Sequence, residues 1–296
     1  MNNRNGNIRK RKFPIGILAA AGILAVLPGR ALAQGPPSFA PPDLDRLVSR
    51  IALYPDPLLA QILAAATYPD QIPEAAHWAD EHHYLTGDAL AAAISGDRLP
   101  WDPSVQALLP FPSVLDTMAS DMHWTADLGN AFLAQQQDVM DAVQRMRRHA
   151  YDYGYLRGGP RVLVNAGPFI EILPADPAFI CVPFYDPLIV FAAPRPGYAI
   201  GAAISFNFGI GIGVAFRPWG WGLNRFAWGS HAVFINNAPW RRNWANRATY
   251  VHPYSVQRYE ASRRVESHEL HGRSDREKQA ARTGHERVEE HGRGGR

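Results

Sequence analysis

Hydrophobic positions in the first half of the chain recur at helical spacing and are interrupted by prolines. Leu44, Leu47, Val48 and Ile51 follow an i, i+3, i+4, i+7 pattern, which places them on one face of a short helix. Residues 58–66 are apolar nearly all round, which predicts a buried central helix. The same criteria predict further helices. One ends at Ala79, and the others cover Ala89–Ile94, Trp101 to Pro110, Val114–Met122 and, as one long helix, Thr125–Ala150.

Aspartates that precede prolines separate these helices. Asp56 stands before Pro57, and Asp102 stands before Pro103. An Asp side chain accepts hydrogen bonds from the free N–H groups of a first turn, and proline at the first helical position loses no hydrogen bond. We therefore expect Asp56 and Asp102 to be helix N-caps, and Asp186 to mark a turn.

After about residue 158 the hydrophobic period changes from helical to two. Residues 162–164, 169–173 and 179–185 predict strands, bounded by Gly-Pro and Asp-Pro turns. Pro183 cannot donate a ladder hydrogen bond, so the last of these strands is expected at a sheet edge.

Residues 205–216 alternate between large apolar and small residues. The large face holds Phe206, Phe208, Ile210, Ile212, Val214 and Phe216, and the other face holds mainly glycine. This pattern predicts one strand, with its large face on the core and its glycine face covered by aromatics from residues 219–244. Because residues 196–216 carry no charge, a membrane-spanning helix stays open as a weaker alternative that the glycines disfavour.

Together these patterns predict an α+β fold. An N-terminal all-helical domain is followed by a small antiparallel β-rich domain and a disordered C-terminal tail, which is charged and almost free of apolar residues. The predicted limits are residues 1–33 for a signal peptide, 34–42 for a Pro-rich leader, 43–157 for the helical domain, 158–250 for the β-rich domain and 251–296 for the tail.

Residues 1–33 have the three parts of a secretory signal. A basic start is followed by an apolar run from Phe13 to Leu27 and by Ala31-Leu32-Ala33, a small-x-small cleavage site. We expect cleavage between Ala33 and Gln34 and a periplasmic or secreted protein. Since about 15 apolar residues fall short of the roughly 20 that span a bilayer, a membrane anchor is the weaker alternative.

Export would change the charge of the protein. Residues 34–296 contain 24 Lys and Arg against 27 Asp and Glu, a net charge of −3, so the basic isoelectric point gives no support for nucleic-acid binding. Residues 34–160 have a net charge of −9 and residues 161–250 one of +4. These two regions could attract each other, or the basic one could face an anionic envelope polymer.

The sequence contains few candidates for catalysis or metal binding. Cys181 is the only cysteine, and its apolar neighbours predict a buried, unreactive thiol. His77, His82 and His83 do not share the i, i+4 spacing of helical metal ligands, and no H-E-x-x-H motif or nucleophile elbow occurs. Gly209, Gly211 and Gly213 miss the dinucleotide-binding spacing. We expect no metal and no cofactor.

The best binding candidates lie in an aromatic and basic stretch that follows residue 216. Indole rings can stack on sugars, and guanidinium groups can bind anions. The alternative is that these side chains cover their own sheet. The candidate residues are Trp219, Trp221, Trp240, Arg241, Arg242 and Trp244.

Carboxylates are the remaining candidates for chemistry. A pair of them could hydrolyse glycosidic bonds. Glu171 is the most unusual, because it stands in a predicted strand among apolar residues. The Asp-Pro aspartates already have a structural role as caps and turns.

Several strings together resemble one bacterial exported family, known as domain of unknown function 3300. They are the runs 51–69, 101–105, 132–136, 138–144 and 182–187, which include Tyr-Pro-Asp-Pro-Leu-Leu-Ala-Gln-Ile-Leu and Val-Pro-Phe-Tyr-Asp-Pro. The resemblance covers about residues 43–259. It implies a Gram-negative envelope protein with no assigned activity. Some members look like lipoproteins, and this sequence departs from them because Gln34 replaces a lipid-accepting cysteine.

These observations favour a non-enzymatic binding or scaffolding module of the cell envelope. The expected partner is an envelope protein or a cell-wall polymer, not a nucleic acid, and membrane contact is not favoured. The alternative is a cell-wall-directed hydrolase that uses carboxylates at the junction of the helical and β-rich regions.

Overall fold

The computed structural model describes residues 35–194, 203–206 and 209–252. The predicted signal peptide, nearly all of the predicted tail and residues 196–202 of the charge-free run lie outside the described residues. The description below concerns the compact unit that begins at Pro36.

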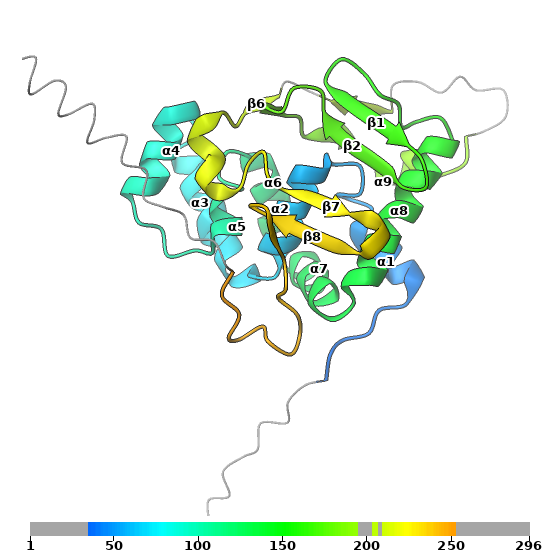
Figure 1. The fold of residues 1–296 in the computed structure, drawn as a ribbon, viewed down its shortest axis with the longest axis horizontal. Coiled ribbons are helices and arrows are strands. Elements are labelled where there is room, and N and C mark those ends of the chain that lie inside the picture. Colours follow the sequence, from blue (N-terminus) through cyan, green and yellow to red (C-terminus); the bar gives the residue numbers. More distant parts are fainter. Residues whose placement is uncertain (1–34, 195–202, 207–208, 253–296) are drawn as a thin grey trace, which may run out of the picture. The chain divides into compact units, whose positions relative to one another are not determined.

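Helices make up the first half of this unit (Figure 1). Each begins at or next to a proline, a glycine or a polar residue, as the punctuation of the sequence predicts. Their bounds are α1 Pro41–Val48, α2 Asp56–Ala66, the 3-10 helix η1 Pro69–Gln71, α3 Ile72–Glu81, α4 Gly87–Gly96, α5 Pro103–Gln106, α6 Pro112–Ser120, α7 Met122–Ala134 and α8 Gln136–Asp152.

The long helix predicted over Thr125–Ala150 is wrong, because the chain breaks at Gln135 into α7 and α8. Gln135 leaves the helical region, with φ −138° and ψ 48°. Its side-chain amide hydrogen-bonds the backbone of Phe39, accepting from the N–H at 2.7 Å and donating to the carbonyl at 3.2 Å. This tertiary contact outweighs the continuous helical pattern.

Helix α2 is the centre of the core, as its apolar sequence predicts. Ten of its eleven residues are buried. Helix α7 crosses it at Gly129, where an added Cβ would lie 1.9 Å from the carbonyl oxygen of Ala66. Only glycine permits this approach.

Short antiparallel strands follow α8. Within the described residues they form four small sheets, ordered β1-β2, β3-β6, β4-β5 and β7-β8-β9. The strand bounds are β1 Val162–Ala166, β2 Ile170–Pro174, β3 Phe179–Ile180, β4 Pro183–Tyr185, β5 Ile204–Phe206, β6 Ile210–Gly211, β7 Arg225–Ala227, β8 Ala232–Ile235 and β9 Ala238–Pro239. The helix α9 Pro187–Val190 and the 3-10 helices η2 Val214–Trp219 and η3 Trp228–Ser230 connect them.

The single strand predicted over residues 205–216 is also wrong. Residues up to Phe206 pair with β4, Ile210 and Gly211 pair with β3, and the chain turns into η2 at Val214. The side chains of Ile212 and Phe216 are buried as predicted, but that of Val214 is 70% exposed. Residues 207–208 lie outside the described residues.

The glycine face is packed differently from the prediction. Phe179 of β3, not an aromatic from residues 219–244, lies against it. An added Cβ on Gly209 would come within 2.8 Å of the Phe179 Cβ, and one on Gly211 would lie 3.6 Å from its ring. Nothing lies within 4 Å of a Cβ added to Gly213.

The α+β architecture is confirmed, and the two predicted regions share a core. One hydrophobic cluster contains residues of α1 to α8 together with Trp219, Trp221 and Trp240. Strands β7 and β8 lie over α2, and the β1-β2 hairpin packs through β2 on α2 and α8 (Figure 1). A second, smaller cluster also contains residues from both sides of residue 158, which thus marks a change of secondary structure and not the edge of a hydrophobic cluster.

No helix in the described part of the chain is both long and apolar enough to span a membrane.

Candidate functional site

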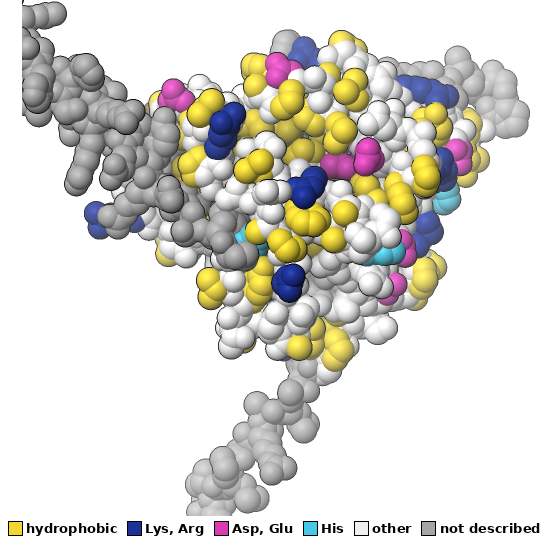
Figure 2. All heavy atoms as spheres, in the orientation of Figure 1, with side chains coloured by type: hydrophobic (Ala, Val, Ile, Leu, Met, Phe, Trp, Pro, Cys, Tyr) yellow, Lys and Arg dark blue, Asp and Glu magenta, His cyan; other side chains and the backbone are white. Residues whose placement is uncertain are grey.

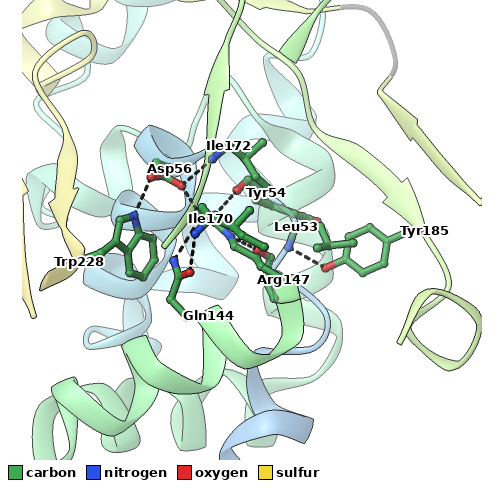
Figure 3. A network of polar contacts seen from close by, with 10 residues as sticks. Leu53, Tyr54, Asp56, Gln144, Arg147, Ile170, Ile172, Tyr185 and Trp228 are labelled. Atoms are coloured by element: carbon green, nitrogen blue, oxygen red, sulfur yellow. Dashed lines mark hydrogen bonds and ion pairs between the residues drawn. The ribbon is translucent and has the colours of Figure 1, made fainter. Parts of the chain in front are cut away.

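A buried ion pair joins the helices to the strands. Arg147 of α8 and Asp56 of α2 meet at 2.6 Å, with side chains only 0% and 4% exposed (Figure 3). The guanidinium also donates to the carbonyls of Ala52, Tyr54 and Ile170 at 2.7–2.9 Å. Four acceptors therefore compensate the desolvation of Arg147.

The same aspartate accepts from the β-rich half. The indole N–H of Trp228 donates to its second oxygen at 3.0 Å, and the guanidinium of Arg147 lies 5.1 Å from the Trp228 ring centre (Figure 3). Burial raises the pKa of Asp56, while Arg147 and Trp228 oppose that rise. Because the carboxylate is enclosed by its own partners, it is not placed to act on a substrate.

This network corrects the role predicted for Asp56, whose side chain makes no cap hydrogen bond to α2. The cap prediction is confirmed for Asp102, which accepts from the Ser104 N–H at 2.9 Å. Asp186 likewise caps α9 through the Leu188 N–H at 2.8 Å. The same Asp-Pro pattern thus supplies a helix cap at Asp102 and Asp186 and one member of a buried ion pair at Asp56.

Most of the predicted binding residues are inside the protein. Trp219, Trp221, Trp240 and Arg242 are buried. The Trp219 indole donates to the Gln106 side chain at 3.0 Å, and the Trp221 indole donates to the Ala107 carbonyl at 3.2 Å. These indole rings therefore cover the helical core, in place of the sheet that the alternative interpretation named.

Arg241 and Trp244 remain accessible to different degrees. Arg241 is exposed and Trp244 is half-buried. The guanidinium of Arg247 lies 3.8 Å from the Trp244 ring centre, so one face of that ring is covered. The six predicted residues therefore do not form one surface.

Arg242 belongs to a cluster of titratable groups at the C-terminal end of α2. It donates to the carbonyl and hydroxyl oxygens of Thr67 at 2.7 Å and lies 3.7 Å from the Tyr68 ring centre. Burial, reinforced by Asp102, raises the pKa of Tyr68, and burial lowers the pKa of His252 to about 4. A cation at a helix C-terminus is favourable, so a structural role accounts for Arg242.

Cys181 and Glu171 lie in different parts of the strand region, Cys181 between β3 and β4 and Glu171 in β2. The predicted burial of Cys181 is confirmed, and burial raises the pKa of its thiol although Arg161 opposes the rise. Glu171 lies in β2 opposite Asn165, between the buried Ile170 and Ile172. It is half-exposed and faces away from their side chains.

The predicted histidine candidates make separate contacts and do not converge on a common point. His77 is exposed beside Glu81, whereas His82 stacks on Trp78 with ring centres 3.9 Å apart. His83 donates through Nδ1 to the Asp80 carbonyl at 2.5 Å. Within the described ranges, no three His, Cys, Asp or Glu side chains gather in a way that could hold a metal ion.

A hollow of about 640 Å³ opens beside η2, and we call it the Arg217 hollow. Apolar side chains form most of its wall, with one cation and one anion at its border. Its residues include Asp176, Ile212, Val214, Arg217, Trp221 and Leu223. Of the predicted binding residues, it contains Trp221 alone.

The Arg217 hollow is suited to binding. Its volume falls in the range of ligand sites, and Val214 and Leu223 are 70% and 45% exposed. Among the described residues Arg217 forms no ion pair, so its charge is available to a ligand. Figure 2 shows apolar side chains between scattered acidic and basic ones on the face that carries η2, β7 and β8.

Comparison with known proteins supports the predicted family. A family model described as "Protein of unknown function (DUF3300)" matches residues 40–275. The chain belongs to this family. It is also similar to the uncharacterized protein YacH of Escherichia coli (strain K12), with 34% identity over 187 residues. That match covers 52% of this chain and 30% of YacH, so the chain corresponds to less than a third of its relative. No solved structure matches significantly.

Two arginines that matter in this DUF3300 fold did not stand out in the sequence. Arg147 lies in a basic triplet with Arg145 and Arg148 that suits a helix C-terminus. Its position between the buried Val143, Met146 and Ala150 is a signal that could have separated it from its neighbours.

Arg217 lies between Phe216 and Pro218, and no local pattern indicates a hollow beside it.

Proposed function

We propose that this DUF3300 protein is exported to the cell envelope and acts there as a non-enzymatic binding or scaffolding module. The composition of residues 1–33 supports export, because a basic start, an apolar run and a small-x-small site follow one another. We propose the Arg217 hollow as the binding site. The observation that carries this proposal is the combination of an available cation with exposed apolar walls in one concave surface.

The chemistry of the hollow favours a protein partner over a cell-wall polymer. Val214 and Leu223 would gain from burial against apolar side chains, which a polysaccharide lacks. Arg217 would set orientation by pairing with a carboxylate of the partner. Hydrolysis of a glycosidic bond uses two carboxylates. Because Asp176 is the one carboxylate among the lining residues of this hollow, the hollow favours binding over hydrolysis.

A photo-crosslinking amino acid in place of Val214 tests the proposal in intact cells. We expect a discrete protein adduct that is absent when the crosslinker replaces the exposed Leu163 on β1. The additional change Arg217→Glu should remove the adduct. An adduct that persists in the Arg217→Glu protein, or attachment to cell-wall sacculi instead of protein, would refute this assignment.

Export is tested separately from binding. The mature protein should begin at Gln34 and appear in the periplasmic fraction without detergent. A mature chain that retains Phe13 to Leu27 would contradict the proposed cleavage.

One observation favours the alternative of a hydrolase. His231 and Asp141 meet at 2.8 Å where the strand region contacts α8, with side chains 29% and 49% exposed. His231 also has a positive φ of 50°, which is uncommon outside glycine. A histidine held by a carboxylate is a general-base arrangement. If it is catalytic, Asp141→Asn should stop release of soluble fragments from isolated cell walls without changing the melting temperature.

A further inference from the structure

A second hollow lies where α3, α4 and the start of α6 approach the segment Gly209–Gly211. It has a volume of about 550 Å³, and we call it the α3–α4 hollow. Leu85, Leu90 and Pro112 line it together with the backbone of Gly209–Gly211. None of these residues belongs to the Arg217 hollow, so the two hollows are separate sites.

Most of the residues that line the α3–α4 hollow are apolar, and some are glycines without a side chain. At Gly209 and at Gly211 of β6 the wall is main chain, which permits a ligand to approach closely. On the side where their Cβ atoms would stand, Gly209 and Gly211 pack against Phe179, at 2.8 Å and 3.6 Å from an added Cβ. The volume of about 550 Å³ is within the range of ligand sites and has room for a bulky apolar side chain.

The helical segment that supplies most of the residues lining this hollow is acidic. Residues 69–122, which form α3 to α6, contain nine Asp and Glu residues and one Arg. Asp80, Glu81 and Asp88 are exposed at the end of α3 and the start of α4. Charges of one sign around a concave site attract partners of the opposite sign and disfavour anions.

The two histidines at the rim add hydrogen-bond acceptors. His82 Nδ1 lies 2.8 Å from the Trp78 carbonyl oxygen, and His83 Nδ1 lies 2.5 Å from the Asp80 carbonyl oxygen. Because a carbonyl only accepts, each Nδ1 carries the hydrogen and each Nε2 of the neutral ring is an acceptor. The Asp97 carboxylate lies 3.9 Å from His82 Nε2. Both acceptors suit the N–H groups of lysine or arginine.

We propose that the α3–α4 hollow docks a basic polypeptide segment. An apolar side chain of that segment fills the hollow, while its Lys or Arg residues pair with the acidic rim and hydrogen-bond His82 and His83. The site is independent of the Arg217 hollow and does not rest on the function proposed for it.

The nature of the occupant can be tested with three fluorescently labelled synthetic peptides of equal length. Fluorescence anisotropy measures the affinity of each peptide for the full-length protein. The first alternates Lys and Leu, the second Lys and Ser, and the third Glu and Leu. We expect saturable binding of the Lys-Leu peptide, weakened by salt, and binding at least about tenfold weaker for the other two. Equal binding of the Lys-Ser or the Glu-Leu peptide would overturn the proposal.

Amino-acid substitutions test whether the Lys-Leu peptide binds at the α3–α4 hollow. Thr86→Trp should fill the hollow and weaken binding of the Lys-Leu peptide by about tenfold or more. The change removes no helix cap, because the Thr86 side chain makes no cap hydrogen bond. Should that variant not fold, Glu81→Gln/Asp88→Asn provides an independent test and should weaken binding about three- to tenfold. Asp152→Asn/Glu171→Gln removes the same charge away from the hollow and should leave affinity unchanged. Equal losses in the two charge variants would refute the assigned site.

Discussion

At the scale of single residues, Asp56 and Arg147 form a buried ion pair whose loss should reduce stability strongly. Each ion is buried, and each is satisfied only by the other and by neighbouring backbone or indole groups. Removing one member of such a pair leaves an uncompensated buried charge. The loss should therefore exceed the ~0.5–2 kcal/mol that is typical of a missing helix cap.

We expect Asp56→Ala to lower the free energy of unfolding by about 3–5 kcal/mol. The double variant Asp56→Leu/Arg147→Met should cost less than the sum of the single changes, because no charge is left buried. Denaturant unfolding of the two single variants and the double variant measures this coupling. Additive losses would show that the two side chains do not act as a pair.

His252 makes stability sensitive to acid. Its pKa falls from its ordinary 6.5 to about 4 in the folded state because the ring is buried. Between these pH values the unfolded chain binds a proton that the folded chain does not, so stability is lost as the pH drops from 6.5 towards 4. Over this whole interval the free energy of unfolding should fall by about 3 kcal/mol.

The variant His252→Phe should therefore lose less stability on acidification than the natural chain does. Melting temperatures at pH 7 and pH 4.5 measure the difference. His77→Phe, at an exposed histidine, controls for the loss of an imidazole as such. Parallel losses in the natural chain and in His252→Phe would contradict the assignment.

At the scale of elements, the contact between α2 and α7 depends on Gly129. Helix propensity alone would make Gly129→Ala favourable by roughly 1 kcal/mol. The added methyl group would instead collide with the Ala66 carbonyl, which is fixed by α2. We expect a net loss of about 1–3 kcal/mol or more, as for overpacking. Gly96→Ala in α4 meets nothing within 4 Å and should be neutral or stabilising in the same unfolding experiment.

The elements differ in how well the sequence predicts them. Helices bounded by prolines and aspartates, such as α2 and α5, follow local chemistry and were predictable. The break at Gln135 was not, because a side chain of the helix pairs with Phe39, which lies 96 residues away in the sequence. The alternation in residues 205–216 is also a local signal, and pairing with two different strands divides it.

Candidate sites are less predictable than elements for the same reason. Trp219 and Trp221 have the composition of a binding surface, and only their contacts with Gln106 and Ala107 show that they are core. A hollow depends on where distant segments leave space, as with Arg217 and Asp176. Local patterns contain no information on that space.

At the scale of the whole molecule, the helices and the aromatic stretch depend on one another. The side-chain amide of Gln61 in α2 donates to the Trp219 carbonyl at 2.9 Å, and Trp228 donates to Asp56. Without residues 158–252 these groups would lose their partners, and the surface of α2 beneath β7 and β8 would be open to water. Exposed apolar surface of this kind costs stability and favours association.

We therefore expect the isolated fragment 36–157 to keep helical circular dichroism but to unfold without a cooperative transition. It should bind 1-anilinonaphthalene-8-sulfonate, the dye that reports loosely packed apolar surface. The fragment 36–252 is the matched control and should melt cooperatively without binding the dye. A cooperative transition in 36–157 near that of 36–252 would show that the helices form an autonomous domain. The tryptophans would then be free to serve a partner rather than the core.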